Sequence, residues 1–583
     1  SVDSMRIVGR NNYNGGVRIG SGSTFNGSRV ALQLTGTGAH GAVAQDGGSL
    51  TLAGSTVSTN GVAAYAALAQ AAGAVSVSGS RLVAAGTNSH ALRADGAGSG
   101  AGADTSILST FANGGIGAAA ANGGTATVRG SQIYVSGIAG GNGTTGMHAS
   151  TGGTLVADGV DIVTGALLGT DASLPTFGLP VDAYGAGVTR PQDLVAVGNT
   201  GANGIAILPT GGSAWINVDP VTGAPTGRTS RIDVLSNSAN GVVMQQASGA
   251  SSALEVANVD VYTWGPTNVI AFQVQGAAGA AGPTGRFRQV SARTQSTNGH
   301  GLFARDGAQA IIEDSTFITA GTGVGIRADG GATRVQGRRL YVATAGEGSN
   351  ALNAIGATID VADSTLITAG RHGMTLSILG GVTGTLIADN TDITTGVLLG
   401  TDMSAASFGR PVDAAGNLLS DPAQYVATGQ GGHAVFAIAA GGNVWMNVDP
   451  ATGAATGSNS VMRTLNDNSE GMDIQGAGTQ ARLANVDIQT AGTNSAGLRS
   501  NGGSRIDARQ VSITTTGTGA YGLAAYADGL VTATGLRLDT AGVGALGLIA
   551  YNTQGRVQVS DAAVRTSGQA GHGAVAWDGG AIE

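Results

Sequence analysis

Residues 496–577 contain four corners of nearly the same sequence: Ala496-Gly497-Leu498, Tyr521-Gly522-Leu523, Leu546-Gly547-Leu548 and His572-Gly573-Ala574. Their central glycines are 25, 25 and 26 residues apart. After each corner come a polar turn and a short alternating apolar run, such as Arg556-Val557-Gln558-Val559, and a Thr/Ser-Gly turn closes the unit. A supersecondary unit that recurs at such a fixed period is typical of a solenoid.

The same period organises the other end of the chain. Corners at His40, Tyr65, His90 and Ile116 are 25, 25 and 26 residues apart, and alternating runs such as Leu50-Thr51-Leu52 follow them. Short strands between Gly-rich turns bring each coil back above the previous one, so each strand pairs with its equivalent one coil away. We therefore predict an all-β fold, a right-handed parallel β-helix with three strands per coil and about 18 coils. A propeller is disfavoured because its blades need longer repeats.

A long internal duplication overlies this short repeat. Residues 395–402 copy residues 164–171, residues 408–413 copy 177–182, and residues 445–450 copy 215–220, at offsets of 231 and 230 residues. Both copies interrupt the regular period, which predicts two long insertion loops, 165–200 and 396–430. The expected segments are an N-terminal cap or irregular first coil (1–35), β-helix coils (36–163), an irregular coil with insertion 1 (164–235), β-helix coils (236–394), an irregular coil with insertion 2 (395–466) and C-terminal β-helix coils (467–583).

Composition excludes several classes of protein. Among 583 residues there are 102 glycines without a triplet period, no cysteine and only 4% aromatic residues, which favours a thin β-core over a collagen-like or disulfide-rich fold. The net charge of −8 and the scattered arginines, with no lysine, disfavour nucleic acid as a partner. No apolar run is long enough to span a membrane. We expect a leader to have been removed and a translocator barrel to follow residue 583.

Catalytic constellations are not recognisable. The seven histidines (His40, His90, His148, His300, His372, His433 and His572) precede Gly or Ala, which predicts one half-exposed ladder rather than a metal site. Carboxylates are scattered, and recurring ones such as Asp314 and Asp363 lie in predicted turns. No nucleophile elbow or phosphate-binding loop is present. We expect no catalytic residue, metal or cofactor, and therefore no enzyme; a glycan-cleaving enzyme is the weakest alternative.

The insertion loops are the best candidates for binding, because loops on a rigid scaffold often carry function and aromatic and Arg side chains often anchor interfaces. Trp215 and Trp445 are expected to plug the apolar interior instead. The candidate partner-binding residues are Asp171, Phe177, Tyr184, Arg190, Asp402, Phe408, Arg410 and Tyr425.

Corners such as residues 40–48 (HGAVAQDGG) and 572–580 (HGAVAWDGG), in a cysteine-free chain rich in Gly, Ala and Thr, resemble the passenger domains of Gram-negative autotransporters. The pertactin-like passengers of Bordetella are the most similar in style. The resemblance covers nearly the whole chain but includes no catalytic motif. It implies a three-sided β-helix, export through the outer membrane and an extracellular or cell-surface location. The Arg-Gly-Asp triplet and the long proline-rich loops of pertactin are absent.

The resemblance implies a virulence factor that binds a host protein and thereby evades immunity. One member of that family binds the plasma serpin C1-inhibitor, so interference with complement and contact-system control is one expectation. The alternative is an adhesin or self-associating passenger that mediates attachment to host cells or aggregation. We expect a monomer, with self-association left open.

Overall fold

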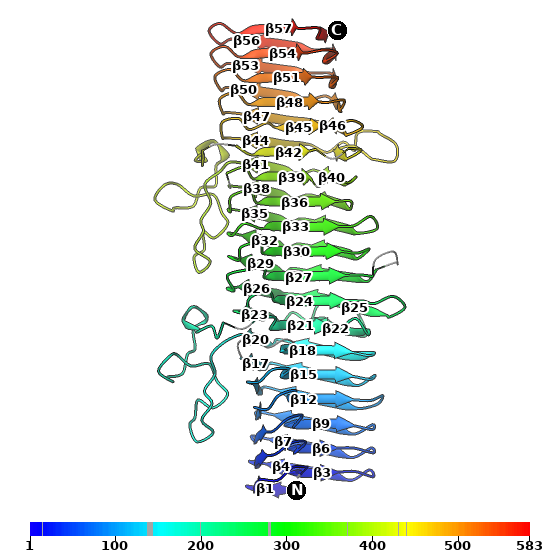
Figure 1. Ribbon diagram of the computed structural model, residues 1–583, viewed down its shortest axis with the longest axis vertical. Coiled ribbons are helices and arrows are strands. Elements are labelled where there is room, and N and C mark those ends of the chain that lie inside the picture. Colours follow the sequence, from blue (N-terminus) through cyan, green and yellow to red (C-terminus); the bar gives the residue numbers. More distant parts are fainter. Residues whose placement is uncertain are drawn as a thin grey trace. The chain divides into compact units, whose positions relative to one another are not determined.

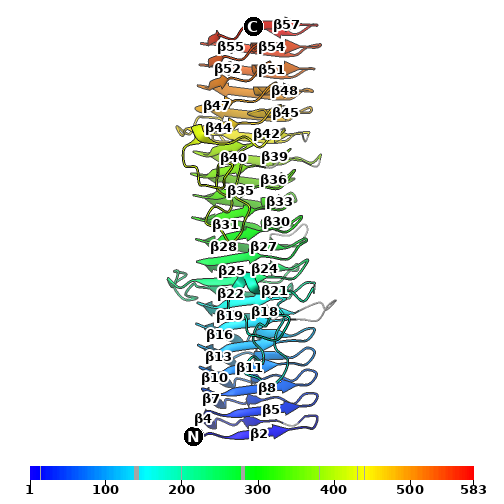
Figure 2. The same cartoon turned by 90° about the vertical axis from the view of Figure 1, so that its left-hand side faces the viewer.

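The computed structural model describes residues 1–13, 15–136, 144–198, 200–277, 282–369, 371–379, 381–429, 431–438 and 440–583. The chain divides into two compact units, unit 1 (Ser1–Thr297) and unit 2 (Asn298–Glu583). In each unit, strands pair in parallel with their equivalents one coil away, as in Leu50 with Val75 and Leu523 with Leu548. The structure is thus the predicted parallel β-helix of three sheets, here called A, B and C (Figures 1 and 2).

Unit 1 contains strands β1–β29, in the chain order A, B, C. Its sheet A comprises β1 (Val2–Asp3), β4 (Thr24–Ser28), β7 (Ser49–Ala53), β10 (Ala74–Ser78), β13 (Gly100–Asp104), β16 (Thr125–Arg129), β19 (Gly153–Asp158), β22 (Gly212–Ile216), β25 (Ser252–Ala257) and β28 (Thr284–Arg288). Sheet B comprises β2 (Arg6–Gly9), β5 (Ala31–Thr35), β8 (Thr56–Asn60), β11 (Arg81–Ala84), β14 (Ile107–Thr110), β17 (Gln132–Val135), β20 (Asp161–Thr164), β23 (Ser230–Val234), β26 (Val259–Thr263) and β29 (Ser291–Thr294). Sheet C comprises β3 (Val17–Ile19), β6 (Ala42–Ala44), β9 (Ala67–Gln70), β12 (His90–Asp95), β15 (Ile116–Ala121), β18 (Thr145–Ser150), β21 (Asn203–Ile207), β24 (Asn240–Gln245) and β27 (Ile270–Gln275).

Unit 2 contains strands β30–β58. Its sheet A comprises β31 (Gln309–Glu313), β34 (Arg334–Arg338), β37 (Thr358–Ala362), β40 (Thr385–Asp389), β43 (Asn443–Met446), β46 (Gln480–Ala484), β49 (Arg505–Arg509), β52 (Leu530–Thr534), β55 (Arg556–Ser560) and β58 (Ala581–Ile582). Sheet B comprises β32 (Thr316–Thr319), β35 (Tyr341–Thr344), β38 (Thr365–Thr368), β41 (Asp392–Thr395), β44 (Ser460–Thr464), β47 (Val486–Thr490), β50 (Ser512–Thr515), β53 (Arg537–Thr540) and β56 (Ala563–Thr566). Sheet C comprises β30 (His300–Arg305), β33 (Val324–Asp329), β36 (Asn350–Ile355), β39 (Met374–Ile378), β42 (His433–Ala437), β45 (Met472–Gln475), β48 (Ala496–Asn501), β51 (Tyr521–Tyr526), β54 (Leu546–Tyr551) and β57 (His572–Trp577).

The number of coils is slightly higher than expected. The 29 described strands of each unit make between nine and ten coils at three strands per coil, against about 18 predicted for the whole chain. Residues 1–35 contribute β1–β5, which make the first coil and two strands of the second, and each pairs in register with the strand one coil further on. Two short 3-10 helices, η1 (Pro191–Asp193) and η2 (Pro422–Gln424), are the helices among the described residues, and neither has the length or apolar character needed to cross a membrane.

Period-2 alternation determines which side chains enter the core. Leu50 and Leu52 are fully buried, whereas Thr51 between them is partly exposed on the outer face. The interior is filled mainly by Ala, Val, Leu and Ile, and only a few aromatic rings such as Phe272 and Phe287 are fully buried. Such a core stabilises the fold by stacking coil on coil, because each coil buries its apolar face only against its neighbours.

The tight corner between sheets A and B uses residues with a positive φ and buried polar side chains. Asn217 has a φ of 54° and is fully buried. Its Oδ1 accepts from the Gly159 amide at 2.8 Å, and its Nδ2 donates to the Ala257 carbonyl at 3.0 Å. Asparagine suits this place because it tolerates the left-handed region and its amide satisfies backbone groups of adjacent coils.

Candidate binding surface

Loop 1 (165–200) leaves unit 1 after β20, and loop 2 (396–430) leaves unit 2 after β41. In each loop four isolated bridges fix the backbone, and they pair equivalent residues in the two copies. Leu168 bridges Pro180 and Val181 bridges Gly187 in loop 1; Leu399 bridges Pro411 and Val412 bridges Leu418 in loop 2. Each loop therefore has a defined internal fold, which Figure 1 shows beside the sheets of its own unit.

Loop 1 is anchored on sheet B by polar contacts and one aromatic contact. Arg81 Nη1 donates to the carbonyls of Pro175 and Phe177 at 2.9 and 3.2 Å, and Ser109 Oγ donates to the Gly178 carbonyl at 2.6 Å. The rings of Phe111 and Phe177 lie 5.7 Å apart. The two donors lie on β11 and β14, and Phe111 lies in the turn after β14, so the loop folds back over earlier coils of its own unit.

Loop 2 is anchored through the equivalent carbonyl, that of Gly409, by a different side chain. The Tyr341 hydroxyl donates to the Gly409 carbonyl at 2.6 Å, and Arg410 Cζ lies 3.8 Å from the centre of the Tyr341 ring. Burial raises the pKa of Tyr341 to about 12, so this hydroxyl remains a donor at neutral pH. Phe408 is 2% exposed. Both loops are thus held close to the sheet, although the anchoring residues differ.

The structure divides the eight candidate residues into three groups. Asp171 and Asp402 accept hydrogen bonds from Ser173 and Ser404, whose donors lower the pKa of each carboxyl, and so they close turns. The residues that hold the loops in place are Phe177, Phe408 and Arg410. Of the other three, Tyr184 and Arg190 are exposed, whereas Tyr425 is half-buried.

The tips of the loops differ in chemistry although their backbones correspond. In loop 1, Tyr184 is 97% exposed and follows Asp182, whose Oδ1 accepts the Tyr184 amide at 2.9 Å. In loop 2, Asp413 accepts the Ala415 amide at 2.9 Å, and Leu418 is 58% exposed. Leu174 is 50% exposed in loop 1. Leu174 and Leu418 were not selected from the sequence. They could have been found as apolar residues within the insertion loops.

The tryptophans do not plug the interior. Trp215 lies between Ala214 and Ile216, which face inward, and is itself half-buried on the outer face of β22. Trp445 occupies the same position in β43, with Arg482 Cζ 4.9 Å from its ring centre. The expectation was wrong because strand alternation, which holds through both segments, places these rings outside.

The histidines do not share one register. His90 pairs with Ile116, and Ile116 pairs with Thr145 in the next coil, whereas His148 pairs with Ala119. His372 precedes Met374, which occupies the position equivalent to His433. Within the shared register, His300 Nδ1 accepts the Val324 amide at 3.2 Å, and Asn350 Oδ1 accepts the Met374 amide at 3.1 Å. The position supplies an acceptor for a backbone amide one coil away, which is a structural role.

One group of possible metal ligands, which sequence reasoning missed, comprises His433, Glu470 and Asp473. Arg499 engages both carboxylates, with Nη1 2.7 Å from Glu470 Oε1 and Nη2 2.6 Å from Asp473 Oδ2. His433 Nδ1 lies 2.5 Å from Glu470 Oε2. Because the guanidinium already binds both carboxylates, the arrangement fits a buried ion-pair network better than a cation site.

Comparisons with known proteins identify neither a family nor a function for this chain. No protein-family model matches the chain, and no curated protein sequence is similar to it. A similar solved structure is the Vag8–C1 inhibitor complex. The similarity covers 98% of this chain and 100% of the other, with a TM-score of 0.46 and 13% sequence identity. At that level it establishes neither a shared function nor a shared partner.

Proposed function

We propose that this chain is the secreted or surface-displayed passenger of an autotransporter and that it binds a host protein through the tips of loops 1 and 2. The observation that carries this proposal is that loops 1 and 2 share the same backbone bridges but expose different side chains at their tips. Two loops with the same bridges are held against a sheet, and they expose Tyr184 in one copy and Leu418 in the other. Rigid presentation lowers the entropic cost of binding, and exposed aromatic and aliphatic side chains are suitable anchors.

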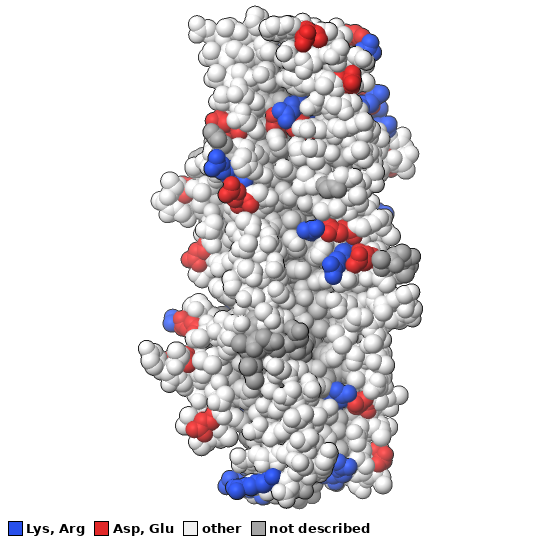
Figure 3. Space-filling model, in the orientation of Figure 1, with Lys and Arg blue, Asp and Glu red and all other residues white. Residues whose placement is uncertain are grey.

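Charge also fits a protein partner better than nucleic acid. The chain has a net charge of −8, and on the face shown in Figure 3 charged side chains are few and scattered. The resemblance of the repeats to Bordetella passengers makes the serpin C1-inhibitor the first partner to test. Binding to that serpin would interfere with complement and contact-system control.

The test is retention of purified C1-inhibitor, and of serum proteins, on the immobilised full chain. Tyr184→Ala gives loop 1 the alanine that loop 2 has at Ala415, and Leu418→Ser removes the exposed side chain of loop 2. The control is Val221→Ser, since Val221 is 91% exposed in a different loop of unit 1. We expect the double loop variant to lose retention of a protein that the native chain and the control retain. The proposal is refuted if the native chain, the double loop variant and the control retain the protein equally. It is also refuted if a chain lacking residues 165–200 and 396–430 retains it as well as the native chain does.

A further inference from the structure

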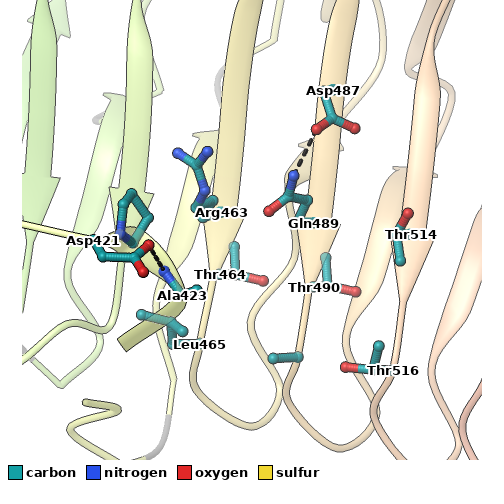
Figure 4. Close-up of a pocket in the computed structure, with 12 residues that line it drawn as sticks. Asp421, Ala423, Arg463, Thr464, Leu465, Asp487, Gln489, Thr490, Thr514 and Thr516 are labelled. Atoms are coloured by element: carbon teal, nitrogen blue, oxygen red, sulfur yellow. Dashed lines mark hydrogen bonds between the residues drawn. The ribbon is translucent and has the colours of Figure 1, made fainter. Parts of the chain in front are cut away.

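A pocket of about 560 Å³, lined by both polar and apolar residues, lies beside loop 2 on the outer face of sheet B in unit 2. One wall is the η2 segment, and the floor comes from β44, β47 and β50 (Figure 4). The side chains that define it are Asp421, Arg463, Asp487, Gln489, Thr514 and Thr516.

Three of these side chains form a row on adjacent strands. Arg463 pairs in register with Gln489, and Gln489 pairs with Thr514, so their side chains emerge about 4.8 Å apart on one face. Figure 4 shows Arg463, Gln489 and Thr514 on successive strands, with Asp421 on the loop opposite.

Much of the hydrogen-bonding capacity in this pocket is unused. Gln489 Nε2 donates to Asp487 Oδ2 at 2.6 Å, and Asp421 Oδ1 accepts the Ala423 amide at 3.0 Å. Each of these contacts uses only one oxygen of its carboxylate. Within the part of the chain that the structure describes, no hydrogen bond or ion pair engages the Arg463 guanidinium or the hydroxyls of Thr514 and Thr516.

The duplicated surface next to loop 1 is filled instead. There Asp233, Tyr262 and Arg293 occupy the places of Arg463, Gln489 and Thr514, and Trp264 occupies that of Ala491. Trp264 Nε1 donates to Asp233 Oδ1 at 2.9 Å, and Arg231 Cζ lies 3.8 Å from the centre of the Tyr262 ring. There Asp233 is engaged by Trp264 and by Arg231, and the rings of Tyr262 and Trp264 occupy the space that is open beside loop 2.

We propose that the pocket beside loop 2 binds a short neutral oligosaccharide. A volume of about 560 Å³ is suitable for a small ligand. Sugar hydroxyls donate and accept at once, which matches a carboxylate, a guanidinium, an amide and threonine hydroxyls within one pocket. One cation between two carboxylates disfavours an anionic ligand, because the pocket is net negative. This proposal does not depend on the proposed function of the loop tips.

The proposal is tested on the full chain with immobilised neutral oligosaccharides, including chitotriose and lactose, and with sialyllactose and spermidine as charged probes. Ala491→Trp fills the pocket as Trp264 fills its counterpart, and Gln489→Ala removes one polar group. The matched control is Ala541→Trp, which places the same ring at the same register position two coils away. Thermal unfolding of each variant checks that it is folded.

We expect a neutral oligosaccharide to bind the native chain and the Ala541→Trp variant, and to bind at least tenfold more weakly to Ala491→Trp and Gln489→Ala. Retention of the protein partner by the loop tips stays unchanged in Ala491→Trp. The proposal is overturned if no neutral saccharide binds, if only sialyllactose or spermidine binds, or if Ala491→Trp binds as well as the native chain. Loss of the protein partner in Ala491→Trp, without saccharide binding, assigns the pocket to a protein interface and also overturns it.

Discussion

The hydroxyl of Tyr341 donates a 2.6 Å hydrogen bond to the carbonyl oxygen of Gly409, 68 residues further along the chain. Tyr341 belongs to sheet B, and Gly409 lies within loop 2, so this bond joins the candidate binding surface to the scaffold. The Arg410 guanidinium covers the same ring and adds a cation–π contact. One tyrosine therefore holds loop 2 in place by both its ring and its hydroxyl.

Tyr341→Phe should loosen loop 2 without unfolding unit 2. Removal of one hydrogen bond to a buried carbonyl costs about 1 kcal/mol, and that cost falls on the loop, which lies outside the stack of coils. Hydrogen exchange in residues 402–420 should become faster, while the thermal midpoint of the coils stays the same. The control is Tyr521→Phe, which lies on sheet C away from loop 2. Equal exchange in both variants would contradict an anchoring role.

Arg499→Met should strongly destabilise unit 2. It removes the guanidinium that pairs with Glu470 and Asp473, which are 3% and 0% exposed, and leaves two buried carboxylates without that cation. Breaking a buried ion pair in this way costs about 3–5 kcal/mol. Urea unfolding measures the loss. Arg565→Met is the control, because Arg565 is 77% exposed and lies 3.8 Å from Asp539, so little change is expected there.

The regular parts of the fold could be predicted from sequence because the signal is local and repeated. The equal spacing of Gly497, Gly522 and Gly547 defines the coil, and the copied segments define two insertions. The alternation around Trp215 could also have predicted its outward position, since Ala214 and Ile216 on either side of it face inward.

Contacts between distant residues could not be predicted. Tyr341 and Arg81 anchor equivalent loops but occupy non-equivalent positions, so the duplication gives no guide to them. The prediction that all seven histidines share one register was wrong for a related reason. A His-Gly or His-Ala pair occurs both at the start of a strand, as at His300, and in a turn, as at His372, and only the ladder pairing distinguishes these places. The pocket beside loop 2 likewise depends on which coils the loop covers.

Acidification should destabilise unit 2 in part through His300. Burial lowers the pKa of His300 from its ordinary value of 6.5 to about 4. Between those values the unfolded chain binds a proton that the folded chain does not, so stability falls as the pH drops from about 6.5 to 4, by on the order of 3 kcal/mol for this residue. His300→Asn should reduce this dependence, because Asn350 makes the same amide contact in its own coil. Thermal midpoints across this pH range measure it, and an unchanged slope in the variant would exclude His300 as the cause.

Gly497→Ala should destabilise the C-terminal coils, whereas Gly573→Ala should be nearly neutral. A Cβ at Gly497 would lie 2.5 Å from Ile513 Cγ2 and 2.7 Å from the Gly522 carbonyl oxygen, but a Cβ at Gly573 meets nothing within 4 Å. Both glycines occupy the same place in the repeat, so the pair isolates the effect of packing. Ala66 occupies this place in another coil, which shows that the backbone can adjust, and we therefore expect a cost of about 1–3 kcal/mol rather than failure to fold. Thermal unfolding of the two variants decides the matter, and equal midpoints would mean that close stacking at this corner does not limit the size of the side chain.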